Sequence, residues 1–287
     1  VTIEVNPGSI NRSGLEKLVD AGVNRVSLGV QTFHADHAKR LARGHTLDQA
    51  HQLLSAVNTI GFRSWSFDLI FALPNQTIED LDKDLDTLLE YSPPHVSLYG
   101  LTIEPNTPFA SQLASGKIKP IEASLWRAMY ERIIERLSRG GLNRYEVSNF
   151  SLSGHRAVHN EQVWRGGYYA GLGPGAHGYL PCGSRTTSHS EIKEWMSNPT
   201  PQIETPSENE AAVDFILSTL RHVDGFSRSH LKASTGFNIA DRVIDKLISH
   251  SLITASQGHI QLTHEAFPIA DGIVRELING LEPLNLT

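Results

Sequence analysis

Four polar side chains stand at or beside the ends of apolar segments and could together bind a small ligand. Glu4, Gln31 and Asp68 lie in or just after strand-like runs, and Arg43 lies on a connection. In a barrel of parallel strands, side chains at the carboxyl ends of the strands face the mouth, where ligands bind. We therefore predict that these four side chains line one ligand pocket.

The four residue types suit different groups of a polar ligand. A carboxylate such as Glu4 binds amino or hydroxyl groups, and the amide of Gln31 both donates and accepts hydrogen bonds. The guanidinium of Arg43 can hold a carboxylate with two hydrogen bonds. Asp68 lies inside an apolar run, where a buried charge needs a partner or a ligand. Taken singly, Glu4 and Arg43 also fit the description of solvated surface charges.

The composition is that of a globular protein and excludes several classes. The chain has 287 residues, a formal charge of -6 and a single cysteine, Cys182. The acidic balance argues against non-specific nucleic-acid binding. One cysteine supplies neither a disulfide framework nor the thiolates of an iron–sulfur cluster. No signal peptide or membrane-spanning apolar run is present, so we expect a cytoplasmic protein.

Strand and helix patterns alternate in residues 1–92 and predict a parallel sheet covered by helices. Within this range, strands are expected at 1–5, 25–29 and 65–71, and helices at 13–20, 47–60 and 77–91. A strand at 96–101 completes at least four βα units, and a long amphipathic helix is expected at 122–139. Ser13 and Thr46 are candidate N-caps. This succession of βα units predicts an α/β fold.

The remainder of the chain has a different organisation. Residues 140–179 are rich in Gly, Asn, His and aromatic residues, which is typical of loops that approach a ligand. Residues 181–207 are expected to form a linker with a helical patch at 191–196. The order of elements predicted in 208–287, including a last helix at 265–278, is typical of a small winged-helix-like α+β domain. Its six Lys or Arg against ten Asp or Glu favour a structural or partner-facing role over DNA binding.

Eight segments carry a resemblance to a known family. In order along the chain they are IEVNP, NRVSLGVQTF, LARGH, DLIFALPNQT, VSLYGLTIEPNTPF, YEVSNF, HNEQVW and GLGPGAHGY. Together they resemble the radical S-adenosylmethionine (radical SAM) family of HemW heme chaperones and oxygen-independent coproporphyrinogen III oxidases. The resemblance implies that residues 1–180 are the C-terminal part of a partial (β/α)6 TIM-like barrel with a HemW-type extension.

The resemblance also implies two cofactors. Glu4, Gln31, Arg43 and Asp68 match family positions that contact S-adenosylmethionine. A [4Fe-4S] cluster is held in the family by a CxxxCxxC motif that this chain lacks. The strand at 1–5 resembles the fourth strand of the barrel, so we expect the cluster-bearing half to lie outside this chain. The chain alone is then not expected to be catalytically competent, and no catalytic residue is assigned.

The segment HNEQVW resembles the HNxxYW motif that is implicated in heme binding in the HemW branch. It keeps His159, Asn160 and Trp164, with His159 as the candidate ligand of the heme iron, while Val163 replaces the family tyrosine. A hydrogen-bonded structural histidine is the alternative. The glycine-rich segment 171–177 is predicted to be a packing loop, and its His177 is a further candidate heme contact.

Two functions from different classes follow from the resemblance. The first is a HemW-like chaperone that binds heme and delivers it to acceptor proteins, including a peripheral contact with membrane-bound heme proteins. The second is an oxygen-independent coproporphyrinogen III oxidase, which decarboxylates a porphyrin precursor. The HNEQVW segment favours the chaperone. A third alternative is a truncated chain that does neither, because its sheet would have a long unpaired edge.

Overall fold

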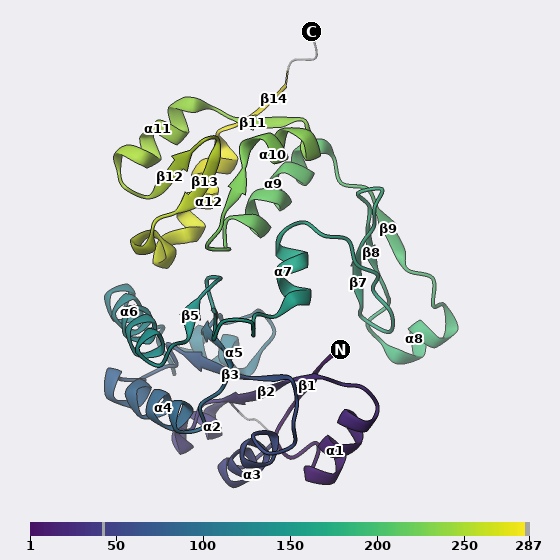
Figure 1. Cartoon of the computed structure of the whole chain (residues 1–287), viewed down its shortest axis with the longest axis vertical. Coiled ribbons are helices and arrows are strands. Elements are labelled where there is room, and N and C mark those ends of the chain that lie inside the picture. Colours follow the sequence, from purple (N-terminus) through teal and green to yellow (C-terminus); the bar gives the residue numbers. More distant parts are fainter. Residues whose placement is uncertain (42–43, 285–287) are drawn as a thin grey trace. The chain divides into compact units, whose positions relative to one another are not determined.

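The chain forms two compact units, Val1–Arg156 and Ala157–Thr287 (Figure 1). The structure is a computed structural model that describes residues 1–41 and 44–284. The units are called here the N-terminal and the C-terminal unit. The predicted division at residues 180 and 207 remains a prediction.

A six-stranded sheet in the order β1-β2-β3-β4-β6-β5 forms the centre of the N-terminal unit. The first four strands are parallel, and β6 is antiparallel to both β4 and β5. The strands are β1 Thr2–Val5, β2 Arg25–Gln31, β3 Ser64–Phe71, β4 His95–Gly100, β5 Asn143–Arg144 and β6 Asn149–Ser151.

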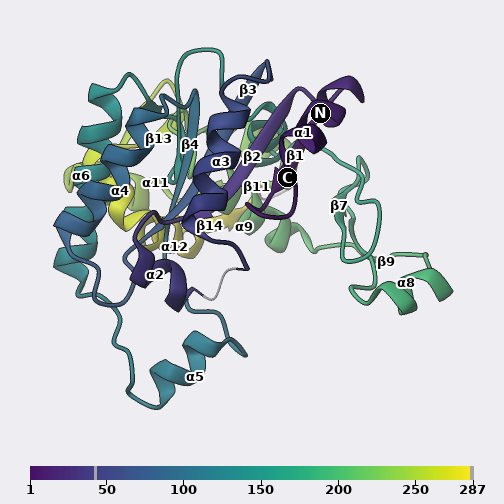
Figure 2. The same ribbon diagram turned by 90° about the horizontal axis from the view of Figure 1, so that it is seen from below.

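Helices cover the apolar face of this sheet. The helices of this unit are α1 Arg12–Asp20, α2 Ala35–Arg40, α3 Leu47–Val57, α4 Ile78–Glu90, α5 Pro108–Ala114 and α6 Ala123–Arg139, and of these α5 buries none of its residues. Helices α3 and α4 lie in front of the strands in Figure 2. Phe67 of β3 meets Tyr91 at the end of α4 at 6.0 Å between ring centroids, and Phe71 stacks on Tyr130 of α6 at 6.2 Å. Because strand side chains alternate between the faces, residues 66, 68 and 70 point away from these helices.

The helix starts follow local capping chemistry. Thr46 and Thr77 each form a capping box with the third residue of their helix, as predicted for Thr46. The predicted cap Ser13 is wrong. The side chain of Asn11 instead accepts a hydrogen bond of 3.0 Å from the backbone N–H of Gly14, so α1 begins at Arg12.

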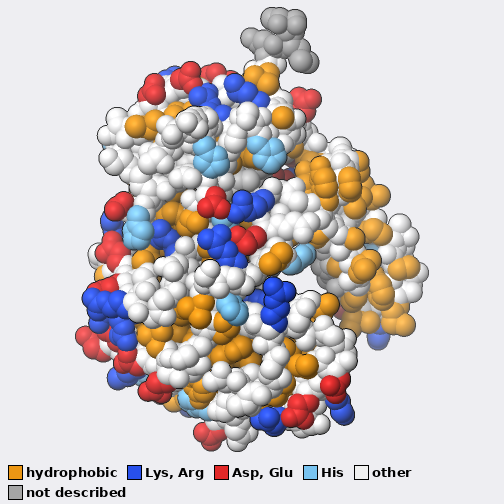
Figure 3. Space-filling model, viewed as in Figure 1, with side chains coloured by type: hydrophobic (Ala, Val, Ile, Leu, Met, Phe, Trp, Pro, Cys, Tyr) orange, Lys and Arg blue, Asp and Glu red, His pale blue; other side chains and the backbone are white. Residues whose placement is uncertain are grey.

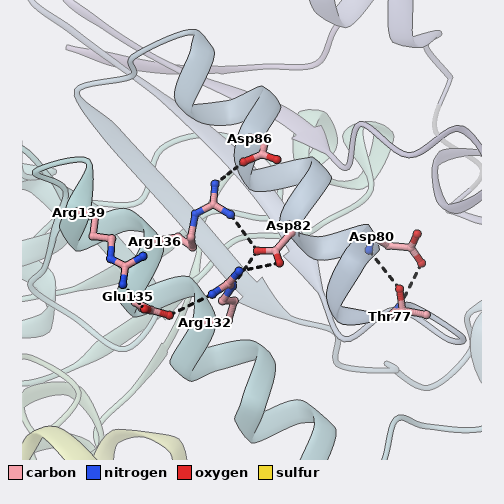
Figure 4. Close-up of polar contacts among 8 residues, drawn as sticks. All are labelled: Thr77, Asp80, Asp82, Asp86, Arg132, Glu135, Arg136 and Arg139. Atoms are coloured by element: carbon pink, nitrogen blue, oxygen red, sulfur yellow. Dashed lines mark hydrogen bonds and ion pairs between the residues drawn. The ribbon is translucent and has the colours of Figure 1, made fainter.

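Ion pairs fasten α4 to α6 (Figure 4). Asp82 accepts from Nε and Nη2 of Arg132 at 2.9 and 3.0 Å, and from Nη1 of Arg136 at 3.0 Å. Arg136 also pairs with Asp86, and Glu135 accepts from Arg132. The two helices that cover the β3 aromatic rings are thereby held together by a network rather than by one isolated pair.

The first part of the C-terminal unit contains a three-stranded antiparallel sheet, β7-β8-β9. Its elements are α7 Val158–Trp164, β7 His177–Tyr179, β8 Arg185–Thr187, α8 Ile192–Ser197 and β9 Gln202–Glu204. Residues 181–207, predicted as a linker, thus include β8, α8 and β9. Hydrophobic side chains gather on the surface of this region (Figure 3), where Ile192, Met196 and Ile203 are each more than 60% exposed.

The rest of the unit has the succession of helices and the antiparallel hairpin of a winged-helix-like domain, as predicted. The sheet order is β10-β13-β12, and β11 pairs with β14. The elements are α9 Glu208–Thr219, β10 Phe226–Ser227, α10 Arg228–Thr235, β11 Phe237–Ile239, α11 Asp241–Ser249, β12 Ile253–Ser256, β13 His259–Leu262, η1 His264–Ile269, α12 Ala270–Asn279 and β14 Leu281–Pro283.

Two expectations for this unit are corrected. The last helix, predicted as one element at 265–278, begins as the 3-10 helix η1, which contains Pro268, before continuing as α12. A proline lacks the N–H that a continuous α-helix needs. Residues 158–164, assigned to a loop-rich segment from composition, form the helix α7.

Candidate functional site

Register brings polar side chains into rows on the sheet face opposite the helices. Glu4 of β1 is level with Ser27 of β2, and Ser27 is level with Ser66 of β3. One step further along β3, Asp68 is level with Ser97 of β4. In a barrel of parallel strands with helices outside, the face opposite the helices is the inward face. The polar character therefore extends along the strands and is not confined to their ends.

Asp68 is partly buried and is supplied with hydroxyl donors. Ser27 Oγ lies 3.1 Å from each carboxylate oxygen of Asp68. Ser66 Oγ lies 2.5 Å from Ser27 Oγ and accepts from Nη2 of Arg25 at 3.1 Å. Arg25 and Asp68 are thus connected through two serine hydroxyls, each of which can accept one hydrogen bond and donate the next.

Burial dominates the electrostatics of Asp68. It raises the pKa of this carboxyl group and outweighs the hydrogen bonds from Ser97 and Ser27 and the positive charge of Arg25, which lower it. The negative charge of Glu4 raises the pKa further. A cationic or hydrogen-bond-donating ligand placed here would favour the carboxylate form, because it would compensate for the lost hydration.

Gln31 ends β2 in an unusual backbone conformation. Its φ angle is +74°, a region that residues other than glycine seldom adopt. The register between β2 and β3 shifts between Leu28 and Gln31, which indicates a bulge at this point. A Cβ at Gly29 would lie 3.0 Å from Nε2 of Gln31 and 2.9 Å from Oδ1 of Asn6. The Gln31 amide therefore lies against the backbone of its own strand, beside the residue that follows β1.

The conformation after Gln31 is held by a residue that the sequence analysis missed. Asp84 of α4 is 3% exposed and accepts from Thr32 Oγ1 at 2.8 Å and from the Phe33 N–H at 2.7 Å. Burial raises the pKa of Asp84 to about 6. A signal was present in the sequence, because Asp84 interrupts the apolar stripe of α4 between Leu81 and Leu85.

The sheet thus brings three of the four predicted pocket residues to adjoining strands. Glu4 is exposed, Asp68 is partly buried and Gln31 is buried. Their carboxylate and amide groups match the amino, hydroxyl and ribose groups of a nucleoside bearing an amino acid. Arg43 lies outside the described residues. The assignment of these side chains to S-adenosylmethionine remains a prediction.

A second polar group on the same face was not predicted. His95 Nε2 lies 2.7 Å from the hydroxyl of Tyr145, and both side chains are almost completely buried. Burial holds the pKa of His95 well below its usual value, so the imidazole is neutral at pH 7. His155 extends the group through a contact of 3.1 Å with Ser64.

The predicted heme segment lies on α7 in the C-terminal unit. His159 and Asn160 are exposed, and the His159 ring meets Tyr169 edge to face at 6.3 Å. Trp164 lies under the guanidinium of Arg221 at 5.5 Å. The imidazole of His159 is therefore accessible at the surface of α7, whereas the indole of Trp164, five residues further along the helix, is packed against Arg221.

The chain does not fit a [4Fe-4S] cluster by itself. Its single cysteine, Cys182, provides one of the three or four thiolates that such a cluster needs. Within residues 1–41 and 44–284, no group of three His, Cys, Asp or Glu side chains is arranged to hold a metal ion. The same part of the chain contains no helix with the length and hydropathy required to cross a membrane.

Comparison with known proteins defines the class first. Residues 1–88 match the radical SAM superfamily. The solved structure of the coproporphyrinogen III oxidase HemN from Escherichia coli superposes with a TM-score of 0.78 over 96% of this chain and 69% of that one, at 20% identity. This match confirms the predicted fold class.

Curated relatives then define the family. The heme chaperone HemW of Bacillus subtilis is 30% identical over 275 residues, 92% of this chain and 72% of that protein. The E. coli HemW is 33% identical over 272 residues, 92% and 70% respectively. The Lactococcus lactis HemW is 40% identical over 179 residues, which is 47% of its length. The chain belongs to the HemW family.

Proposed function

We propose that this chain acts as a HemW-type heme chaperone, which binds heme through α7 and delivers it to acceptor proteins in the cytoplasm. The observation that carries the proposal is the exposed His159 on α7, within a segment that keeps three of the four fixed residues of the HNxxYW motif. An imidazole is a common protein ligand of heme iron. An exposed ligand also suits a chaperone, since its cargo must be released to another protein.

The polar sheet face supports a second part of the proposal, namely S-adenosylmethionine binding. Asp68 and Glu4 suit the ammonium and hydroxyl groups of this cofactor, and Gln31 suits a group that both donates and accepts. The cofactor supplies a methionyl sulfonium whose cleavage needs a reduced cluster. No cluster ligand is assigned to this chain. Its own residues bind and orient the cofactor, and the neutral His95 and Tyr145 line the same face.

Heme titration followed by the Soret band tests the proposal. We expect His159→Ala to weaken hemin binding by about tenfold or more, because an iron ligand is lost. His264→Ala is the matched control, since His264 is an exposed histidine on η1. Equal affinity of the His159→Ala variant and the parent chain contradicts the assignment of heme to α7.

Delivery requires its own experiment. Hemin-loaded protein is mixed with an apo-hemoprotein, and transfer is followed by the appearance of the acceptor's Soret band. The same loaded protein is mixed in parallel with apo-myoglobin, which only scavenges heme that has dissociated. A faster transfer to the first acceptor than to apo-myoglobin supports a chaperone. Equal rates to both indicate passive dissociation.

A further inference from the structure

A large cavity lies inside the C-terminal unit, next to α7. Its volume is about 960 Å³, and its walls come from the segment after α7, the β7-β8 hairpin, α9 and α10. Small-molecule sites span roughly 300–1,000 Å³, so this cavity is at the upper end of that range. Its size suits a ligand as large as a tetrapyrrole.

Aromatic rings make up part of the wall. Tyr168 and Tyr179 lie 5.5 Å apart with an angle of 36° between their rings, and Tyr168 is 50% exposed. From the two helices, Phe215 and His230 meet at 5.0 Å, edge to face. All four side chains line the cavity. Such rings offer flat apolar faces on which a planar macrocycle can stack.

The charges that line the cavity are paired within the unit. Arg165 pairs with Asp224 at 2.6 Å, and Arg185 pairs with Asp214 and with Glu204. Two arginines and two acidic side chains, Asp214 and Glu204, belong to the lining, so their formal charges cancel. The cavity therefore suits a ligand whose body is uncharged and whose acidic groups reach solvent.

His177 also belongs to the lining, and one of its ring nitrogens has a hydroxyl partner. His177 of β7 is exposed, and its Nδ1 lies 3.3 Å from Oγ1 of Thr187 on β8. When Nδ1–H donates to that hydroxyl, Nε2 keeps its lone pair, as is usual for a metal-bound histidine. Val163 of the HNEQVW segment lines the same cavity, and so does Tyr169, which contacts the His159 ring.

We propose that this cavity holds the heme macrocycle, with Nε2 of His177 as a ligand of the iron and Tyr168 and Tyr179 against the ring. The inference rests on the proposed heme binding and deepens it. It extends the site from His159 on the surface of α7 into the cavity, whose lining includes Val163 of that helix. It also gives Val163 a role, since a small side chain there leaves the cavity open.

The test compares two probes, hemin and metal-free protoporphyrin IX. We expect His177→Ala to weaken hemin binding by about tenfold or more, and to shift its Soret maximum, because a ligand is removed from the iron. Protoporphyrin has no iron, so its affinity, measured by Tyr fluorescence quenching, should be unchanged. Ala211→Trp fills the cavity from α9 and should weaken the binding of both probes. His250→Ala is the control.

The outcomes separate this inference from the function on which it depends. Loss of hemin binding in His159→Ala, with normal binding in His177→Ala and Ala211→Trp, overturns the cavity site and leaves the proposed function standing. Normal hemin binding in all three variants overturns both. If circular dichroism shows that Ala211→Trp is unfolded, Tyr168→Ala replaces it, and unchanged protoporphyrin affinity in that variant counts against the cavity.

Discussion

The carboxylate of Asp84 accepts a hydrogen bond of 2.7 Å from the backbone N–H of Phe33, two residues beyond Gln31. A buried acidic side chain on α4 thereby holds the end of β2. The same carboxylate accepts from Thr32 Oγ1, so both residues that follow Gln31 are tied to one helix. Because the φ angle of Gln31 is positive, this tether keeps the strand end in a conformation that the chain would otherwise seldom adopt.

Asp84→Ala is expected to lower the free energy of unfolding by about 2 kcal/mol, because a buried hydroxyl and a partly buried backbone N–H lose their acceptor. It should also weaken S-adenosylmethionine binding, since Gln31 is no longer held in place. Asp84→Asn keeps one acceptor oxygen and should be milder in both respects. Urea unfolding and calorimetric titration provide the two measurements. Parent-like values for Asp84→Ala in both would contradict the positioning role.

The raised pKa of Asp84 predicts a pH dependence of stability. The pKa of Asp84 is about 6 in the folded chain, whereas an aspartate that is free in solution has a pKa of 3.8. Between these two pH values the folded state therefore binds more protons than the unfolded state. The free energy of unfolding should therefore fall as the pH rises from about 4 to about 6, by an amount on the order of 3 kcal/mol. Asp84→Asn removes this contribution. The contribution of Asp84 is the difference in the free energy of unfolding between parent and variant, measured at several pH values from about 4 to about 6. A difference that does not change with pH would refute the prediction.

Asp82→Asn should lower the free energy of unfolding at pH 7 by about 1 kcal/mol, because the partly exposed network between α4 and α6 loses its central charge. Hydrogen bonds from Arg132 lower the pKa of Asp82. Its contribution is therefore complete above about pH 4 and is lost as the pH falls through the lowered folded-state pKa. The difference between parent and variant should shrink on acidification. Chemical unfolding at several pH values measures it, with the exposed Asp48→Asn as control.

Asp68→Ala is expected to weaken S-adenosylmethionine binding by about 10-fold to 100-fold, as for the loss of a charged hydrogen-bond partner. Binding by the parent should strengthen as the pH rises through the raised pKa of Asp68, because the carboxylate form is the one that binds an ammonium group. Asp48→Ala, an exposed change on α3, should leave the affinity unchanged. Isothermal titration calorimetry measures these affinities. Equal affinities of the parent and the Asp68→Ala variant for S-adenosylmethionine would show that Asp68 is not part of the binding pocket.

Gly29→Ala should disturb the same pocket without changing a charge. The added Cβ would lie within 3.0 Å of Asn6 Oδ1 and Gln31 Nε2, so both side chains must move. We expect weaker S-adenosylmethionine binding and a modest loss of stability. Gly272→Ala is the matched control, because its Cβ meets nothing within 4 Å and alanine stabilises a helix interior by about 1 kcal/mol relative to glycine. Similar results for the two variants would contradict the close approach at Gly29.

Much of the N-terminal unit could be predicted from periodicity and caps. The strands around residues 25–29 and 65–71 and the cap at Thr46 are local features, written in consecutive side chains. The family resemblance was also determined by the sequence alone and is confirmed by the relatives. Short elements such as α7 and β7 were missed, because a few residues carry too little periodicity to distinguish a helix from a loop.

Only the tertiary structure decided which side chains meet. Asp68 and Ser97 are level because β3 and β4 pair in one register, and a shift of one residue would turn the whole polar row toward the helices. Asp84 reaches Phe33 only because α4 packs beside the end of β2. The sequence determined which residues could do chemistry, through their type and their place in each element. Register and packing join residues far apart along the chain, so they determined which of those residues form one site.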